Sequence, residues 1–196
     1  GFNADLVCVV CKTDPEGGAK GTSLLMVETK DLEGFSKNTP LKKIGMKGQD
    51  TCELFFDNCR IPAGNLLGGQ EGQGFFQLMA QLPRERLMIA VGAIAGIEAA
   101  LEEAISYTKE RKAFGKAIAD FQNTKFKLAE MATEARIGRV FVDDCIEKLN
   151  AGTLDTETAS MAKWWCAEKQ FETANKALQL HGGYGYMMEY PIAHYF

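Results

Sequence analysis

The chain has 196 residues, of which 46% are apolar, and a net charge of −4 with acidic and basic residues interspersed. Such a chain can bury a core, and it fits one large domain or a small domain joined to part of another. It has no basic stripe to follow a phosphate backbone, so nucleic acid is not an expected partner. No apolar run reaches the roughly 20 residues of a membrane span, and the N-terminus does not resemble a signal or transit segment.

The six cysteines lie in strand-like or helix-like apolar patterns rather than in turn-rich spacings. This placement is typical of reduced, buried thiols in a reducing compartment. Cys8 and Cys11 form a C-x-x-C pair, but a zinc site needs two more ligands, and the two histidines, His181 and His194, lie far along the chain. We therefore expect no metal site.

Residues 5 to 60 have the pattern of β-structure. Apolar runs at 6–11 and 23–28 and an alternating segment at 51–57 predict strands, and the Pro- and Gly-containing segment 14–18 predicts a turn. Three or four strands whose first member is an exposed apolar edge do not form a stable sheet alone. We therefore expect further strands upstream of this chain.

From Glu71 onward the pattern is that of long helices. The first is expected to reach about Glu110, with Pro83 starting a new segment or kinking the helix. The second begins near Asp120 with a heptad seam, and the third spans about 155–180. The residues predicted to face inward are Ala90, Ile94, Ile97, Leu101 and Ala104 on the first helix, Phe121, Thr124, Leu128, Met131, Ala135, Gly138, Val142, Cys145 and Leu149 on the second, and Met161, Trp164, Phe171, Ala174 and Leu178 on the third.

A fourth helical stretch is expected from Tyr186 to the last residue. The predicted fold class is α+β, with a partial antiparallel β-domain over residues 1–66 and an up-down helical bundle over residues 67–196. Three antiparallel helices with apolar stripes leave surface to cover, so oligomerisation is expected from the pattern alone.

Glu85 lies in the segment Leu-Pro-Arg-Glu-Arg-Leu, and on a helix it has no basic residue three or four positions away. Its neighbours there include Met88 and Ile89. Apolar surroundings disfavour the charged form of a carboxylate, as a general base near neutral pH requires. The alternative is a solvated glutamate or one paired through a tertiary contact.

Two further segments could bind a ligand. Residues 110–116, Glu-Arg-Lys-Ala-Phe-Gly-Lys, join the first two helices, and an arginine with an aromatic residue three positions on can hold a phosphate or flank a flat ring. An ordinary basic helix end is the alternative. Residues 179–186 contain three glycines that let backbone amides approach a ligand, although the segment has neither the strand nor the spacing of a dinucleotide fingerprint.

Taken in order, these segments resemble the acyl-CoA dehydrogenases over essentially the whole chain. The resemblance rests on Arg-Lys-Ala-Phe-Gly-Lys at 111–116 followed by Gln122, on Gln-Leu-His-Gly-Gly-Tyr-Gly-Tyr at 179–186, and on residues 45–51 followed by Phe-Phe-Asp at 55–57. It implies a middle β-domain and a four-helix C-terminal domain, truncated here, in a homodimer or homotetramer that binds FAD between subunits.

The resemblance also implies roles for individual residues. Those expected to contact the FAD of a neighbouring subunit are Arg111, Phe114, Gln122, Gln179, Leu180, His181, Gly182 and Gly183. Those expected to line the acyl-CoA pocket are Phe76, Pro83, Arg84 and Arg86. The long-chain and isovaleryl types carry the catalytic base on the first long helix, in a segment similar to the one that contains Glu85.

The implied reaction is the oxidation of an acyl-CoA thioester to the trans-2-enoyl-CoA, with an electron-transfer flavoprotein reoxidising the flavin. Glu85 removes the α proton and FAD accepts the hydride from the β carbon. The compartment would be the cytoplasm of a bacterium or the mitochondrial matrix of a eukaryote. The chain ends before the position where most family members carry the base and lacks their upstream domain, so alone it is expected to be inactive.

Two other interpretations remain open. One is a different reaction on the same scaffold, as in acyl-CoA oxidases, flavin monooxygenases or nitroalkane oxidases, although the last use an aspartate base. The other is a non-catalytic helical oligomerisation module, which the heptad seam favours equally.

Overall fold

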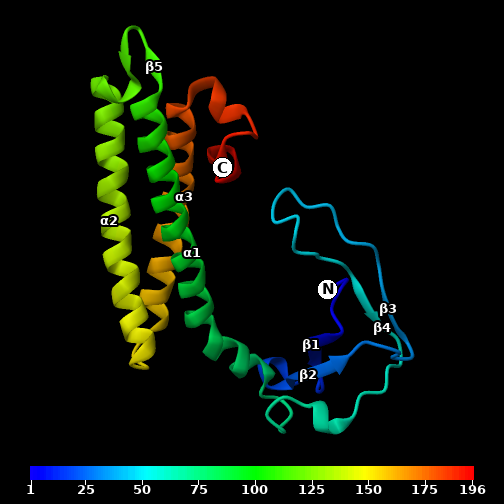
Figure 1. Ribbon diagram of the computed structural model, residues 1–196. Coiled ribbons are helices and arrows are strands. Elements are labelled where there is room, and N and C mark those ends of the chain that lie inside the picture. Colours follow the sequence, from blue (N-terminus) through cyan, green and yellow to red (C-terminus); the bar gives the residue numbers. More distant parts are fainter. The chain divides into compact units, whose positions relative to one another are not determined.

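The computed structural model describes residues 1–196, which form two compact units, Gly1–Ala80 and Gln81–Phe196. Figure 1 shows β-strands in the first unit and long helices in the second. The first helix, α1 (Gly74–Glu110), begins in the first unit and contributes most of its length to the second.

The first unit contains two separate antiparallel strand pairs. β1 (Leu6–Lys12) pairs with β2 (Thr22–Glu28), and β3 (Phe35–Lys37) pairs with β4 (Leu54–Phe56). The first two predicted strands are confirmed, whereas the third is shorter than predicted. Short 3-10 helices, η1 (Gly18–Gly21) and η2 (Ala63–Asn65), follow β1 and β4.

The cysteines are free thiols, but the expectation that they are buried is wrong for most of them. In this chain only Cys145 and Cys166, in the helical unit, are buried, and Cys8 is exposed on β1. Cys8 and Cys11 lie on opposite faces of β1, because successive strand residues alternate between faces. Burial raises the pKa of the Cys166 thiol to about 11.

Three long helices run side by side in the second unit (Figure 1). α2 (Gln122–Asn150) and α3 (Thr156–Leu180) follow α1, and a hairpin of β5 (Lys112–Ala113) and β6 (Lys116–Ala117) with η3 (Ile118–Asp120) joins α1 to α2. The predicted helix limits are confirmed to within three residues. None of the helices is long and apolar enough to cross a membrane.

Local sequence explains where the helices begin and continue. Asp155 caps α3, since its Oδ1 accepts a hydrogen bond of 2.6 Å from the backbone N of Thr158. Pro83 does not start a new segment: α1 continues through it, although proline has no N–H to donate within the helix.

The core of the bundle confirms two of the three predicted faces. On α1, Ala90, Ile94, Ile97 and Ala104 are fully buried, and Leu101 packs against the core from a half-buried position. On α2 the buried residues are Thr124, Met131, Ala135, Gly138, Val142 and Cys145, which are members of the predicted seam. Gly138 is required there, because a Cβ would lie 2.7 Å from Ile94 and 2.8 Å from Trp165.

The predicted inner face of α3 is wrong in its largest members. Met161, Trp164 and Phe171 are 51%, 63% and 60% exposed in this chain. The buried residues of α3 are small, namely Ala159, Ala162, Cys166, Thr173, Ala174 and Ala177. Small side chains let the three helices approach closely, and the large apolar side chains form a second stripe on the outside.

The segment after α3 also differs from the prediction of a fourth helical stretch. It forms two short 3-10 helices, η4 (Gly182–Tyr186) and η5 (Pro191–His194), separated by a turn. Proline at the start of η5 has no N–H to give to a continuing helix. Ile192 of η5 is fully buried and packs in a cluster with Ala100, Ala104 and Ala177.

Interhelical ion pairs supplement the core. Arg139 on α2 makes two hydrogen bonds to Glu98 on α1, of 2.9 Å and 2.6 Å, which hold the pKa of the Glu98 carboxyl below its usual range. Lys169 on α3 lies 2.9 Å from Glu134 on α2.

Candidate functional site: a cavity at the end of the helical bundle

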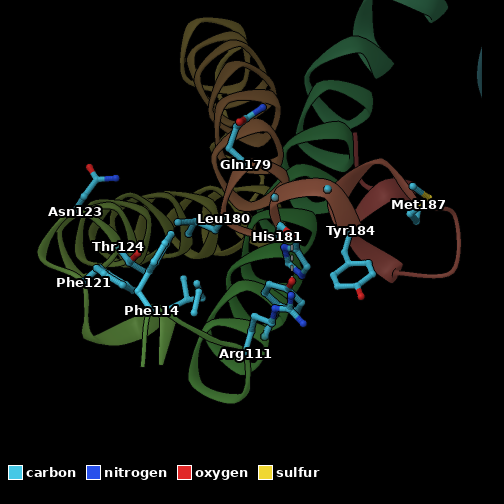
Figure 2. A pocket seen from close by; sticks show the side chains of 15 residues that line it. Arg111, Phe114, Phe121, Asn123, Thr124, Gln179, Leu180, His181, Tyr184 and Met187 are labelled. Atoms are coloured by element: carbon cyan, nitrogen blue, oxygen red, sulfur yellow. Dashed lines mark hydrogen bonds between the residues drawn. The ribbon is translucent and has the colours of Figure 1, made fainter. Parts of the chain in front are cut away.

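A cavity of about 790 Å³ lies at the end of the bundle where α1 gives way to the β5–β6 hairpin. Its walls come from the last turn of α1, the hairpin and η3, the first turn of α2, the end of α3 and η4. The lining is predominantly apolar, and Figure 2 shows Arg111, Phe114, His181 and Tyr184 gathered around it.

All the residues predicted to contact the cofactor line this cavity except Gln122. Arg111 and Phe114 come from the connection between α1 and α2, and the segment 179–183 comes from the end of α3. Gln122 is exposed at the start of α2, where its neighbours Asn123 and Thr124 line the cavity instead. The fold thus brings together two segments separated by more than 60 residues in sequence.

The hairpin presents Phe114 in a strained conformation. Phe114 and Gly115 form the two-residue turn between β5 and β6, with φ of 52° and 80°. Such a turn requires left-handed residues, and a residue with a side chain pays about 1 kcal/mol or more for adopting that conformation. The Phe114 ring is 96% exposed and meets Phe121 edge-to-face at 6.3 Å. A strained, exposed aromatic residue beside a cavity is typical of a ligand-binding position.

The three glycines after α3 are glycines for different reasons. Gly182 has a φ of 58°, which favours glycine, and a Cβ on Gly185 would lie 2.4 Å from the carbonyl oxygen of Leu178. Gly183 has no positive φ, and a Cβ there would meet no atom within 4 Å. Nothing within this chain therefore requires glycine at 183, whereas close approach of a ligand to the backbone would.

The backbone amides of this turn are available to a ligand. The N–H groups of Gly182 and Gly183 make no hydrogen bond in the chain, and both residues are exposed at the cavity. Arg111 lies over the ring of Tyr184 at 5.3 Å, which places its guanidinium next to the turn. A guanidinium and free amides suit an anionic group, and the aromatic and apolar walls suit a flat ring.

His181 is less accessible than the other predicted contacts. It is 3% exposed, and its Nδ1 donates a hydrogen bond of 2.8 Å to the carbonyl oxygen of Ala177. Its ring stacks on Tyr107 with centroids 4.2 Å apart. Its role in this chain is to fix the end of α3, and a direct contact with a cofactor stays a prediction.

Tyr107 is a cavity residue that sequence reasoning missed. Its hydroxyl donates a hydrogen bond of 3.1 Å to the carbonyl oxygen of His181. Burial raises the pKa of this phenol, so it keeps its proton as a donor. The available signal was its spacing, because Tyr107 is one helical turn before Arg111 and projects from the same face of α1.

The segment around Glu85 contrasts with this cavity. The Glu85 side chain is exposed on α1 and takes part in none of the side-chain hydrogen bonds or ion pairs. Its apolar neighbours Met88 and Ile89 are 63% and 51% exposed. This chain alone therefore neither pairs nor encloses the Glu85 carboxylate.

The predicted substrate residues lie on the same helix. Arg84 is exposed, whereas Pro83 and Arg86 are partly buried, and neither arginine pairs with a carboxylate. Phe76 belongs to the first unit, where its ring is 45% exposed and meets Phe75 edge-to-face.

The strands, the long helices and the arginine- and glycine-lined cavity define the class of the protein. Residues 72–196 match the family described as "Acyl-CoA dehydrogenase, C-terminal domain". The chain belongs to the acyl-CoA dehydrogenase family, whose members are FAD-dependent oxidoreductases.

Individual relatives agree with this assignment. The chain is 49% identical to the mitochondrial long-chain specific acyl-CoA dehydrogenase of Mus musculus over 195 residues, which is 98% of this chain and 45% of the relative. The crystal structure of an acyl-CoA dehydrogenase from Geobacillus kaustophilus matches 100% of this chain and 51% of its own with a TM-score of 0.95 and 49% identity. Butyryl-CoA dehydrogenase from Megasphaera elsdenii matches with a TM-score of 0.93 and 35% identity, over 100% and 50% of the two chains. The chain thus spans about half the length of the relatives that it matches.

Proposed function

We propose that this chain forms part of an FAD-dependent dehydrogenase that oxidises acyl-CoA thioesters to trans-2-enoyl-CoA, with Glu85 as the catalytic base. In this proposal the complete protein also contains the regions that the relatives have and this chain lacks. The observation that carries the proposal is the cavity, where the two segments similar to the family's signatures converge. The same proposal assigns residues 1–66 to a partial middle β-domain and residues 67–196 to the C-terminal helical domain.

The chemistry of the cavity fits part of an FAD molecule. Arg111 and the unpaired amides of Gly182 and Gly183 can bind the diphosphate, because phosphate oxygens accept several charge-assisted hydrogen bonds at once. The exposed Phe114 ring and the neighbouring Phe121 can flank a flat ring of the cofactor. Leu180 contributes apolar wall, and Gln179 adds an exposed amide at the rim.

The geometry of α1 supports a cofactor shared between two copies of the chain. Glu85 and Glu110 are separated by about 38 Å along the helix, at about 1.5 Å per residue. This exceeds the reach of one extended dinucleotide from the base to the cavity of the same chain. A flavin ring next to Glu85 therefore needs an ADP-binding cavity from another copy, in a homodimer or homotetramer.

Uncovered apolar side chains also support an oligomer. Trp164 and Phe171 on α3 and Phe126 on α2 are each at least 60% exposed, although an isolated bundle gains nothing from placing them outward. Burial against further copies or against the regions absent from this chain would remove this apolar area from water.

The proposed chemistry assigns a simple task to Glu85. Its carboxylate removes the α proton of the bound thioester, and the flavin, when bound, supplies the acceptor for the β hydride. Pro83, Arg84, Arg86 and Phe76 would contact the acyl-CoA. Met88 and Ile89 provide apolar neighbours that exclude water from the carboxylate once they are covered.

Two consequences of the proposal concern the cellular setting. An electron-transfer flavoprotein would take up the electrons from the reduced flavin. The compartment would be the mitochondrial matrix in a eukaryote, as the mitochondrial relative suggests, or the cytoplasm in a bacterium.

The test is anaerobic mixing of the complete enzyme with a long-chain saturated acyl-CoA while the flavin absorbance is followed. We expect wild type to bleach and Glu85→Gln to bind the substrate but bleach about 10²- to 10⁴-fold more slowly. Glu102→Gln is the matched control, because Glu102 is another exposed glutamate on α1. Bleaching of Glu85→Gln at the wild-type rate would show that the base lies elsewhere, and an FAD-loaded wild type that does not bleach would contradict the dehydrogenase assignment.

A further inference from the structure

Tyr107 makes two contacts with His181, the residue directly before the turn Gly182–Tyr186, which we call the glycine turn. Its hydroxyl donates to the carbonyl oxygen of His181 at 3.1 Å, and its ring stacks on the His181 imidazole at 4.2 Å with 22° between the planes. His181 is the C-cap of α3 and the N-cap of η4, so its carbonyl is one of those that α3 itself leaves without a partner. The tyrosine of α1 thus completes the C-terminus of α3.

This hydrogen bond also controls the orientation of the next amide. The carbonyl of His181 and the N–H of Gly182 belong to one planar, trans peptide unit, so they point in opposite directions. Whatever fixes the carbonyl therefore fixes the direction of the Gly182 N–H. His181 is also the N-cap of η4, so the Tyr107 hydroxyl adds a second restraint on this peptide unit to the one that the 3-10 helix supplies.

The aromatic side chains after the turn restrict it from the other side. Tyr190 contacts Tyr107 edge-to-face at 6.0 Å and lies 4.9 Å from Tyr184. Arg111, four residues beyond Tyr107 and just after the end of α1, lies over the Tyr184 ring at 5.3 Å. The C-terminal end of α1 and the residue that follows it therefore contact both His181, before the glycine turn, and Tyr184, within it.

We propose that Tyr107 is a positioning residue that directs the Gly182 N–H toward a phosphate of FAD. This proposal rests on the proposed function, which puts the diphosphate beside Arg111 and the glycine turn. A donor that is already oriented before binding loses less conformational entropy when the ligand arrives, so Tyr107 strengthens cofactor binding without touching the cofactor. Close packing of Ala100, Ala104 and Ala177 already joins α1 to α3 without the hydroxyl.

The test is Tyr107→Phe in the complete enzyme, which removes the hydroxyl and keeps the stacked ring. We expect the dissociation constant of FAD, measured by titrating the apoprotein, to rise about five- to tenfold, the effect of ordering one more group at the moment of binding. With FAD at saturation, kcat and the KM for acyl-CoA should return to wild-type values, because Tyr107 is far along α1 from Glu85. Tyr186→Phe is the matched control, since Tyr186 is in the same turn but is 88% exposed and does not line the cavity.

A purely structural role would give a different result. In that case Tyr107→Phe would lower the melting temperature while the folded protein bound FAD with wild-type affinity, and this outcome would overturn the proposal. Arg111→Ala separates this failure from a failure of the proposed function. If Arg111→Ala weakens FAD binding and Tyr107→Phe does not, only the positioning role is wrong; if neither variant weakens it, the cavity is not the FAD site.

Discussion

The two ends of α1 in the helical unit are organised differently. At its C-terminal end, Tyr107 and Arg111 are each engaged by the turn after α3, through a hydrogen bond, a stacked ring and a cation–π contact. Near Pro83, Glu85 has no polar partner, and its apolar neighbours are exposed. One end of the helix has the geometry proposed for cofactor binding within a single chain, whereas the other has only the residue proposed as the base.

This difference follows from what each site needs. Cofactor binding needs donors in fixed directions, which neighbouring turns of one bundle can provide. A general base needs a dry environment and a substrate in contact, which a single outward-facing helix cannot provide. The comparison predicts that changes at the cavity act on FAD affinity and that changes at Glu85 act on the chemical step.

The sharpest test of the cavity compares Gly183→Ala with Gly185→Ala. We expect Gly183→Ala to weaken FAD binding by about tenfold or more with an unchanged melting temperature, because its Cβ meets nothing in the chain. Gly185→Ala should instead destabilise the protein by about 1–3 kcal/mol, because its Cβ would overlap the Leu178 carbonyl. Flavin titration and thermal unfolding of both variants measure the two effects. Equal effects of the two substitutions on FAD affinity would mean that the turn tolerates no side chain for structural reasons alone.

The pair Arg139–Glu98 lies between the two ends of α1 and tests whether the cavity depends on the whole bundle. We expect Arg139→Ala to destabilise the helical unit by about 1 kcal/mol, a modest value because both side chains are partly exposed. FAD affinity of the folded protein should not change. A large loss of FAD affinity would mean that the shape of the cavity depends on this distant ion pair.

The same pair predicts a pH dependence. Arg139 holds the pKa of Glu98 below the ordinary value of 4.5, so the folded pKa is lower than the unfolded one. The stabilisation is fully present above about pH 4.5 and is lost as the pH falls through the folded pKa. The free energies of unfolding of wild type and Glu98→Gln can be compared by denaturant unfolding between pH 7 and about pH 3. We expect the difference between these two free energies to become smaller as the pH falls. A constant difference would contradict the role of the ion pair.

The smallest expected effect is at Thr173, inside the bundle. Its hydroxyl is fully buried and has no hydrogen-bond partner. Thr173→Val removes the unsatisfied group at nearly constant volume, so we expect stabilisation of up to about 1 kcal/mol with unchanged FAD affinity. Thermal unfolding measures it, and a destabilised variant would show that the hydroxyl has a partner that this single chain does not contain.

The sequence predicted the elements better than it predicted their faces. The period of the apolar residues sufficed to locate the helices, because this signal is local. On α3 the sequence contains two apolar stripes: the pattern favours the one with the large Trp164, whereas close helix packing selects the one with the small Ala162. Periodicity alone does not reveal how closely two helices approach.

Sequence motifs predicted some of the residues of the candidate site. They did not reveal the residues whose role depends on contacts between different helices. Arg111 and Gly183 belong to recognisable segments, and the structure brings them to one cavity. Tyr107 belongs to no motif, and its importance depends on the packing of α1 against the end of α3. Such a contact joins residues 74 positions apart, which no local pattern encodes.

The central claim is that the base of one chain and the cavity of another serve the same flavin. Its most direct test is a hybrid dimer of the complete enzyme, purified through two different tags, in which one chain carries Glu85→Gln and the other Arg111→Glu. Neither parent should turn over acyl-CoA, because one lacks the base and the other the cavity. We expect the hybrid to recover about half of the wild-type turnover, since one of its two sites combines an intact base with an intact cavity. A hybrid as inactive as its parents would show that the base and the cavity must belong to the same chain.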